Sequence, residues 1–195
     1  MFKYFLLHKP YNYLSQFTKE VPEHLTLADL GSFPKEVYPV GRLDKDSEGL
    51  LLLTDDKKLN HKLLNPAFKH PRTYWAQVEG LFNVQAMDTL RQGVDILINK
   101  KLYKTLPASV EILKEVKGIE DRDPPIRYRA SIPTSWIQLT LIEGKNRQVR
   151  RMCAKVGFPV LRLVRASIGR LNLEGIPRGE FVERKEEDIY KAFDF

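Results

Sequence analysis

The residues most able to do chemistry stand between two glycines in the first third of the chain. Residues 41–49 read GRLDKDSEG, so five of these nine side chains are ionisable, and four leucines follow at residues 50–53. The leucine run predicts a buried strand, beside which unpaired charge would be costly to bury. We therefore expect some of these charged groups to stay in water and others to pair with groups from elsewhere in the sequence. Such a segment forms the rim of a functional site.

The acidic residues of this segment imitate a calcium-binding loop in their spacing. Residues 38–41, which contain a proline and a glycine, cannot form the helix that leads into such a loop. Leucines at residues 52 and 53 fill positions that stay open to oxygen ligands in a calcium loop. The four histidines have no metal-ligand spacing either. No metal site is expected.

Asp44 and Asp46 are a possible carboxylate pair, because residues two apart on an extended chain point to the same side. Such pairs carry out glycoside hydrolysis, although they usually come from different elements of an aromatic sugar-binding groove. The alternative without chemistry is an aspartate that only ties down a loop.

A second candidate region is strongly basic. Residues 144–173 contain eight basic side chains and no acidic one. In a helix predicted over residues 147–156 the cations gather in the N-terminal half, where they oppose the helix dipole, so helix stability does not explain them. Contact with phosphate, or pairing with a buried carboxylate, does explain them. A solvated basic face is the alternative.

The composition limits the class of protein. The chain of 195 residues carries a net charge of +7, which favours a polyanionic partner such as nucleic acid. No apolar run is long enough to span a membrane, no signal peptide is recognisable, and a single cysteine, Cys153, excludes internal disulfides. No glycine-rich phosphate loop or dinucleotide fingerprint is present, so a reaction without a cofactor is favoured. A cytoplasmic protein is expected, and a basic ribosomal or assembly protein without catalysis is the alternative.

Short strands with interspersed helices must position these regions. Strands are predicted over residues 3–8, 73–79 and 136–142, as short pieces within 94–113, and as two strands around Gly169. One helix is predicted after Asp55 or Asp56 with Leu59 and Leu63 inside, and another after Asn83 with Val84, Met87 and Leu90 inside. Residues 118–125 form a charged loop that could face RNA. The predicted class is α+β with a largely antiparallel mixed sheet flanked by helices.

Taken together, three segments resemble the RsuA-type ribosomal RNA pseudouridine synthases. They are LHKPY at residues 7–11, GRLDKDSEGL at 41–50 and EGKNRQVRRM at 143–152, and RTY at 72–74 is similar to the tyrosine strand of the family. Residues 124–136 look most like the type, designated E, that acts on the 23S RNA of the large subunit. In the wider family a histidine often stands where this chain has Arg147, and this departure also fits that type.

The resemblance implies a fold and a domain organisation. It implies a pseudouridine synthase catalytic fold in two coupled halves, with the active-site cleft between them and one catalytic domain over residues 1–195. Many relatives carry an N-terminal S4 RNA-binding domain. None is expected here, so RNA affinity is expected from the basic residues 144–173.

The resemblance also implies roles for individual residues. Asp44 would be the nucleophile, and Arg150 would offset the cost of keeping its carboxylate ionised while enclosed. Arg42 would help to hold the target uridine out of its helix, since a stacked, paired uridine is not accessible. Tyr74 would stack on the flipped uracil and remove its C5 proton. Attack of Asp44 on the ring and attack on the sugar are both compatible with these residues.

The resemblance further implies the partner and the RNA-binding residues. The partner would be 23S ribosomal RNA, with no metal, cofactor or membrane, and the protein would act as a monomer in ribosome biogenesis. The RNA-contacting set is expected to comprise Lys9, Arg42, Lys145, Asn146, Arg147, Arg151, Arg162 and Arg165.

Overall fold

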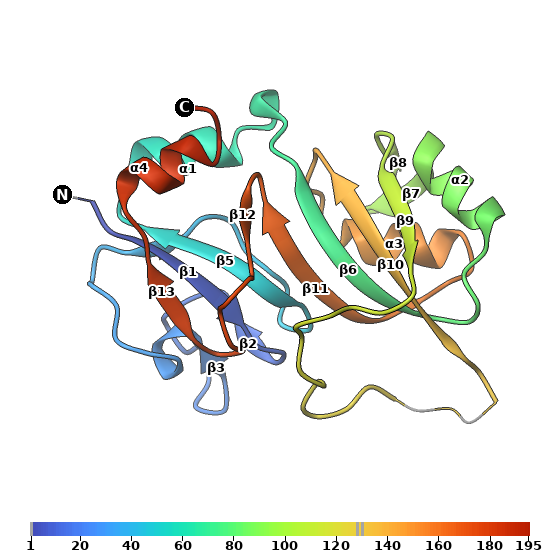
Figure 1. Ribbon diagram of the computed structural model, residues 1–195, viewed down its shortest axis with the longest axis horizontal. Coiled ribbons are helices and arrows are strands. Elements are labelled where there is room, and N and C mark those ends of the chain that lie inside the picture. The colour runs from blue at the N-terminus through green and yellow to red at the C-terminus, as the bar shows by residue number, and fades with distance from the viewer. Residues whose placement is uncertain (1, 128, 130) are drawn as a thin grey trace. The chain divides into compact units, whose positions relative to one another are not determined.

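The chain forms two compact units, each described here by itself. The computed structural model describes residues 2–127, 129 and 131–195 (Figure 1). Unit 1 combines the residues up to His70 with Arg165–Phe195, and unit 2 comprises Pro71–Val164. One strand, β11 (Val160–Ile168), runs along the chain from unit 2 into unit 1. That the two units act as one catalytic domain remains a prediction.

Unit 1 is built on strands that are buried along their whole length. β1 (Tyr4–Lys9) pairs antiparallel with β5 (Glu48–Thr54) and with β13 (Phe181–Glu183). Every residue of β1 and β5 is buried, which explains the leucine run: both faces of β5 are covered by apolar side chains. The remaining short strands of this unit are β2 (Tyr13–Leu14), β3 (Leu25–Thr26), β4 (Tyr38–Pro39) and β12 (Leu171–Asn172).

The two α-helices of unit 1 are joined through one buried carboxylate, that of Asp56. They are α1 (Lys57–Leu64) and α4 (Glu186–Lys191), and the unit also contains the 3₁₀ turns Leu27–Asp29 and Pro66–Phe68. Asp56 caps α1, as the sequence predicts, by accepting hydrogen bonds from the amides of Lys58 and Leu59 at 3.0 Å. Its other oxygen accepts from the Tyr4 hydroxyl at 2.9 Å and the Tyr190 hydroxyl at 2.8 Å. In Figure 1, α1 and α4 accordingly lie together at the ends of β1 and β5.

The Asp56 network predicts an acid-sensitive stability. Burial by itself would raise the pKa of Asp56, but the hydrogen bonds from Leu59, Tyr190, Tyr4 and Lys58 outweigh it and hold this pKa below its usual value. Because the folded-state pKa is the lower one, the stabilisation is complete above the unfolded pKa near 4 and is lost as the pH falls through the folded value. Asp56→Asn should therefore lower the free energy of unfolding by about 2 kcal/mol at pH 7. Below about pH 4, the free energy of unfolding of this variant should fall less steeply with decreasing pH than that of the wild type.

Denaturant titrations between pH 2 and 7 measure this effect. The exposed carboxylate of Asp188 offers a control in the same unit, and Asp188→Asn should keep the wild-type dependence on pH. If the free energy of unfolding of Asp56→Asn fell below pH 4 as steeply as that of the wild type, the assigned role of this carboxylate would be wrong.

Unit 2 packs two helices and a hairpin on one face of an antiparallel sheet. β6 (Arg72–Glu79) pairs with β10 (Thr134–Leu141), which pairs with β9 (Ser109–Leu113). The covering elements are α2 (Val84–Gln92), α3 (Gln148–Lys155) and the hairpin of β7 (Asp95–Ile98) with β8 (Lys101–Lys104) (Figure 1). Their apolar side chains form one core with those of the sheet, including Ala76, Ile137, Leu90, Ile96 and Met152.

The structure confirms the α+β class and the largely antiparallel pairing, and it corrects several details. In α2 the inward residues are Ala86, Leu90 and the partly buried Met87, whereas Val84 is 61% exposed. In the largely exposed loop 118–125 the Arg122 guanidinium donates to the carbonyls of Pro124, Pro125 and Leu161. That this loop faces RNA remains a prediction. No helix in the described part of the chain is both long and apolar enough to cross a bilayer.

Candidate active site

Asp44 lies in a tight turn whose backbone is fixed on both sides. The Ser47 amide donates to the Asp44 carbonyl at 3.0 Å and closes the turn. Just before it, buried Leu43 donates its amide to the Ser15 hydroxyl at 3.0 Å, and that hydroxyl lies 2.9 Å from the Leu43 carbonyl. Just after it, the Asn12 amide donates to the Lys45 carbonyl at 2.8 Å. The half-buried Asp44 side chain is thus presented by a backbone that has little freedom to move.

Lys9 supports this arrangement from inside. It is fully buried, and its Nζ donates to the carbonyls of Pro10 at 2.8 Å and Tyr13 at 2.7 Å. Burial lowers the pKa of Lys9 to about 7, against the opposing charges of Glu48, Asp46 and Asp44. Lys9 therefore fixes the 10–13 loop, which in turn holds the Asp44 turn.

The end of the same segment is buried in charged surroundings. Glu48 is 1% exposed, and Arg165 is 4% exposed with its Nε donating to the Leu50 carbonyl at 2.8 Å. Gly49 has φ +111°, and a Cβ placed on it would lie 2.4 Å from the backbone N and O of Arg165. Glycine is thus required here by both backbone conformation and space.

The turn also removes the geometry expected of a carboxylate pair. Residues 44–47 form a turn and not an extended segment, so Asp44 and Asp46 do not have the same-side placement that extended spacing predicts. Arg42 and Lys45 are exposed, while Ser47 and Glu48 are buried. The mixture of exposed and enclosed charges expected from the sequence is therefore present. Among the residues that the structure describes, no group of three or more metal-binding side chains is placed to hold an ion.

Unit 2 carries the other two predicted catalytic residues. Tyr74 lies on β6 opposite Leu139 of β10 and packs, half-buried, against the core of the unit. Arg150 lies on α3, is half-buried, and donates from Nη1 to the Val160 carbonyl at 3.2 Å. Tyr74 is thus held by packing and Arg150 by a hydrogen bond within unit 2, and both side chains remain partly accessible.

The loop that leads into α3 presents three of the predicted RNA-binding residues. Lys145, Asn146 and Arg147 are exposed, and Arg147 takes the left-handed conformation with φ +51°. The buried side chain of Gln148 closes the loop by accepting from the Lys145 amide at 2.9 Å. The helix consequently begins at Gln148, one residue later than predicted.

Three residues of the predicted RNA-binding set are corrected by their burial. Lys9, Arg162 and Arg165 are 0%, 5% and 4% exposed. Arg162 donates to the Glu120 carbonyl at 2.9 Å, much as Lys9 and Arg165 bind carbonyls of their own unit. These cations are therefore internal supports and not an exposed surface for phosphate.

Sequence patterns do not point to the residues that hold the site in place. Ser15 lies in a polar loop with no distinguishing pattern. Glu143 accepts from the Tyr103 hydroxyl, the Leu106 amide and the Gln148 amide group, and its hydrogen bond raises the pKa of Tyr103 to about 12. The one signal for Glu143 is its position, as an acidic residue directly before the basic residues 144–173. Cys153 is buried as predicted, and burial raises its pKa to about 12, which leaves an unreactive thiol.

The sequence and the fold of this chain are both similar to those of known proteins. Residues 3–155 match the family of RNA pseudouridylate synthases, and the chain belongs to this family. It is a pseudouridine synthase, an isomerase that acts on RNA.

Individual relatives support the family assignment. The chain is 50% identical to the ribosomal large subunit pseudouridine synthase E of Vibrio vulnificus, over 93% of this chain and 74% of that protein. It is 48% identical to the protein of the same designation from Xanthomonas axonopodis, over 88% of each. A crystal structure of a pseudouridylate synthase matches with a TM-score of 0.79 and 27% identity, over 98% of this chain and 74% of that one. The predicted fold is therefore confirmed.

Proposed function

We propose that this chain isomerises a uridine of large-subunit (23S) ribosomal RNA to pseudouridine. The observation that carries the proposal is the Asp44 carboxylate on a turn fixed by Ser15 and Asn12, within a chain of the pseudouridylate synthase family. A nucleophile on so rigid a support suits a reaction that depends on geometry rather than on a cofactor. The similar proteins named for the ribosomal large subunit support the choice of RNA.

In the proposed mechanism, Asp44 attacks the target nucleotide and the C1′–N1 glycosidic bond breaks. The uracil turns so that C5 faces the sugar. A C1′–C5 bond then forms and the bond between the nucleotide and Asp44 breaks, which restores the carboxylate. The Tyr74 hydroxyl removes the proton from C5, while N1 of the product takes up a proton, so atoms and charge balance. Arg150 of α3 is proposed to supply positive charge to the reacting groups.

RNA binding is assigned to the exposed members of the predicted set. Lys145, Asn146 and Arg147 on the α3 loop, with Arg42 next to the Asp44 turn, offer donors to phosphate oxygens. Extrusion of the target uridine costs a few kcal/mol, which such backbone contacts offset. The protein is proposed to act in the cytoplasm as a monomer without a metal or cofactor.

The test is site-by-site mapping of pseudouridine in unmodified ribosomal RNA. Transcribed 23S RNA, transcribed 16S RNA and precursor large-subunit particles are treated with the protein, then with carbodiimide, and read as reverse-transcription stops. One new stop in 23S RNA or its precursor particle, and none in 16S RNA, is expected. New stops in 16S RNA alone would reject the assigned RNA, and no stop on any substrate would reject the reaction.

A further inference from the structure

The β7–β8 hairpin of unit 2 has an outer face that the core does not use. Strand pairing sets Leu97 opposite Leu102 and Asp95 opposite Lys104. Ile96 and Tyr103 alternate with these residues and face the core. On the outer face, Leu97 is 58% exposed and Leu102 is 71% exposed. Two large apolar side chains exposed side by side indicate a surface that contacts another molecule.

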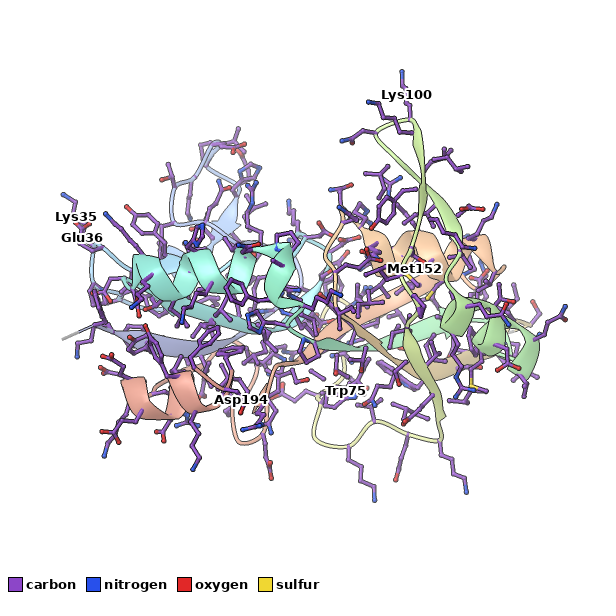
Figure 2. The ribbon with its side chains drawn as sticks, turned by 90° about the horizontal axis from the view of Figure 1, so that it is seen from above. Lys35, Glu36, Trp75, Lys100, Met152 and Asp194 are labelled. Atoms are coloured by element: carbon purple, nitrogen blue, oxygen red, sulfur yellow. The ribbon has the colours of Figure 1, made fainter. Side chains whose placement is uncertain are left out.

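Lysines surround this apolar pair. Lys100 lies in the turn, and Lys101 follows it opposite Ile98. Lys104 lies two residue pairs beyond the leucines and on the same face as they do. All three are exposed, against a single acidic residue, Asp95, between residues 95 and 104. In Figure 2, Lys100 lies at the far end of the hairpin, and its side chain points away from the unit. The charge therefore favours an anionic partner.

The hairpin is fastened to the loop that precedes α3. Arg151 donates to the Leu97 carbonyl and, through Nε, to the Asn146 carbonyl at 3.1 Å. The Lys145 ammonium lies 4.9 Å from the centre of the Tyr103 ring. The exposed lysines of the hairpin and the exposed cations of the α3 loop thus belong to one rigid piece of unit 2. A nucleic acid held by that loop would extend onto the hairpin.

We propose that this outer face binds a double-helical segment of the RNA substrate, apart from the target uridine. Lys100 and Lys104 would contact phosphates, and Leu97 and Leu102 would lie against ribose groups of the wide, shallow minor groove. The proposal rests on the RNA substrate proposed above. The face has no aromatic side chain on which unpaired bases could stack, because Tyr103 is turned inward, so single-stranded RNA fits it less well.

Charge reversal of the two lysines assigned to phosphate contact tests the proposal. Lys100→Glu/Lys104→Glu should weaken binding to a 20-base-pair RNA duplex about tenfold at 0.1 M salt, and should lower the slope of log Kd against log salt by about 1 to 2. Binding to a single-stranded RNA of equal length should change less than twofold. Fluorescence anisotropy with Asp44→Asn protein measures both affinities without turnover.

The control variant reverses the charge of two exposed lysines of α1. Lys57→Glu/Lys58→Glu makes the same change of net charge in the other unit and should change duplex affinity less than twofold. Equal losses in the two variants would mean a general effect of charge and would overturn the proposal, as would equal losses on duplex and single strand. Because binding is read independently of pseudouridine formation, failure here is distinguishable from failure of the proposed function.

A photo-crosslinking amino acid at position 102 identifies the partner directly. In precursor large-subunit particles it should form crosslinks to ribosomal RNA within base-paired segments. Crosslinks confined to ribosomal proteins would reassign the hairpin to a protein partner and reject the RNA assignment.

Discussion

Asp44→Asn should lower pseudouridine formation by at least about 10⁴-fold, because it removes the nucleophile on which the reaction depends. The change keeps the size and shape of the side chain but leaves an amide that does not attack. The turn itself is held by backbone and Ser15 contacts at Leu43 and Lys45, none of which uses the Asp44 side chain. The variant should therefore still fold, and its affinity for RNA should stay within about twofold of that of the wild type.

Tritium release from RNA labelled at C5 of uridine measures this loss, since C5 gives up its hydrogen in the reaction. Asp46→Asn is the matched control on the same turn and should retain activity within about tenfold. Equal loss of activity in both variants would indicate a carboxylate pair in place of a single nucleophile. Equal loss of RNA binding and turnover in Asp44→Asn would indicate a binding residue, and the catalytic role would have to be abandoned.

The elements whose signals are local were predictable from the sequence. The caps at Asp56 and Asn83 act within a few residues of the chain, as does the alternation of β6. The leucine run of β5 reflects burial of both strand faces, and that pattern too is read within one element. The charged residues 41–49 beside this buried strand likewise indicate the site, because unpaired charge is costly to bury.

The features that escaped prediction depend on contacts between distant residues. A lysine or arginine in the sequence gives no sign of whether carbonyls elsewhere in the chain will enclose it. Lys9 and Arg165, which the sequence predicts as RNA contacts, therefore turn out to support the fold from inside. The turn at residues 44–47 was likewise hidden, because it is held by residues 12 and 15 across the fold. The left-handed backbone of Arg147 had no residue-type signal, since such a conformation usually favours glycine or asparagine.

Gly49→Ala should destabilise the protein by more than about 4 kcal/mol, because two costs add at one position. The backbone has φ +111°, which an alanine adopts only with strain of about 1–3 kcal/mol. The new Cβ would also lie 2.4 Å from the backbone N and O of Arg165, which have no flexible side chain to move aside. A loss of this size is a large part of the 5–15 kcal/mol typical of a folded domain.

Urea denaturation of the variant, compared with Gly175→Ala, separates the two costs. Gly175 has φ +72° and nothing within 4 Å of a built Cβ, so its replacement carries backbone strain alone and should cost about 1–2 kcal/mol. A difference of less than about 1 kcal/mol between the two variants would show that the backbone at residues 49 and 165 moves apart to accept a Cβ at little cost. The predicted larger difference would mean that the close approach to Arg165 holds the end of the 41–49 segment. Any Gly49→Ala protein that remains folded should then also lose turnover, since this approach and the Asp44 turn are held on the same short stretch of chain.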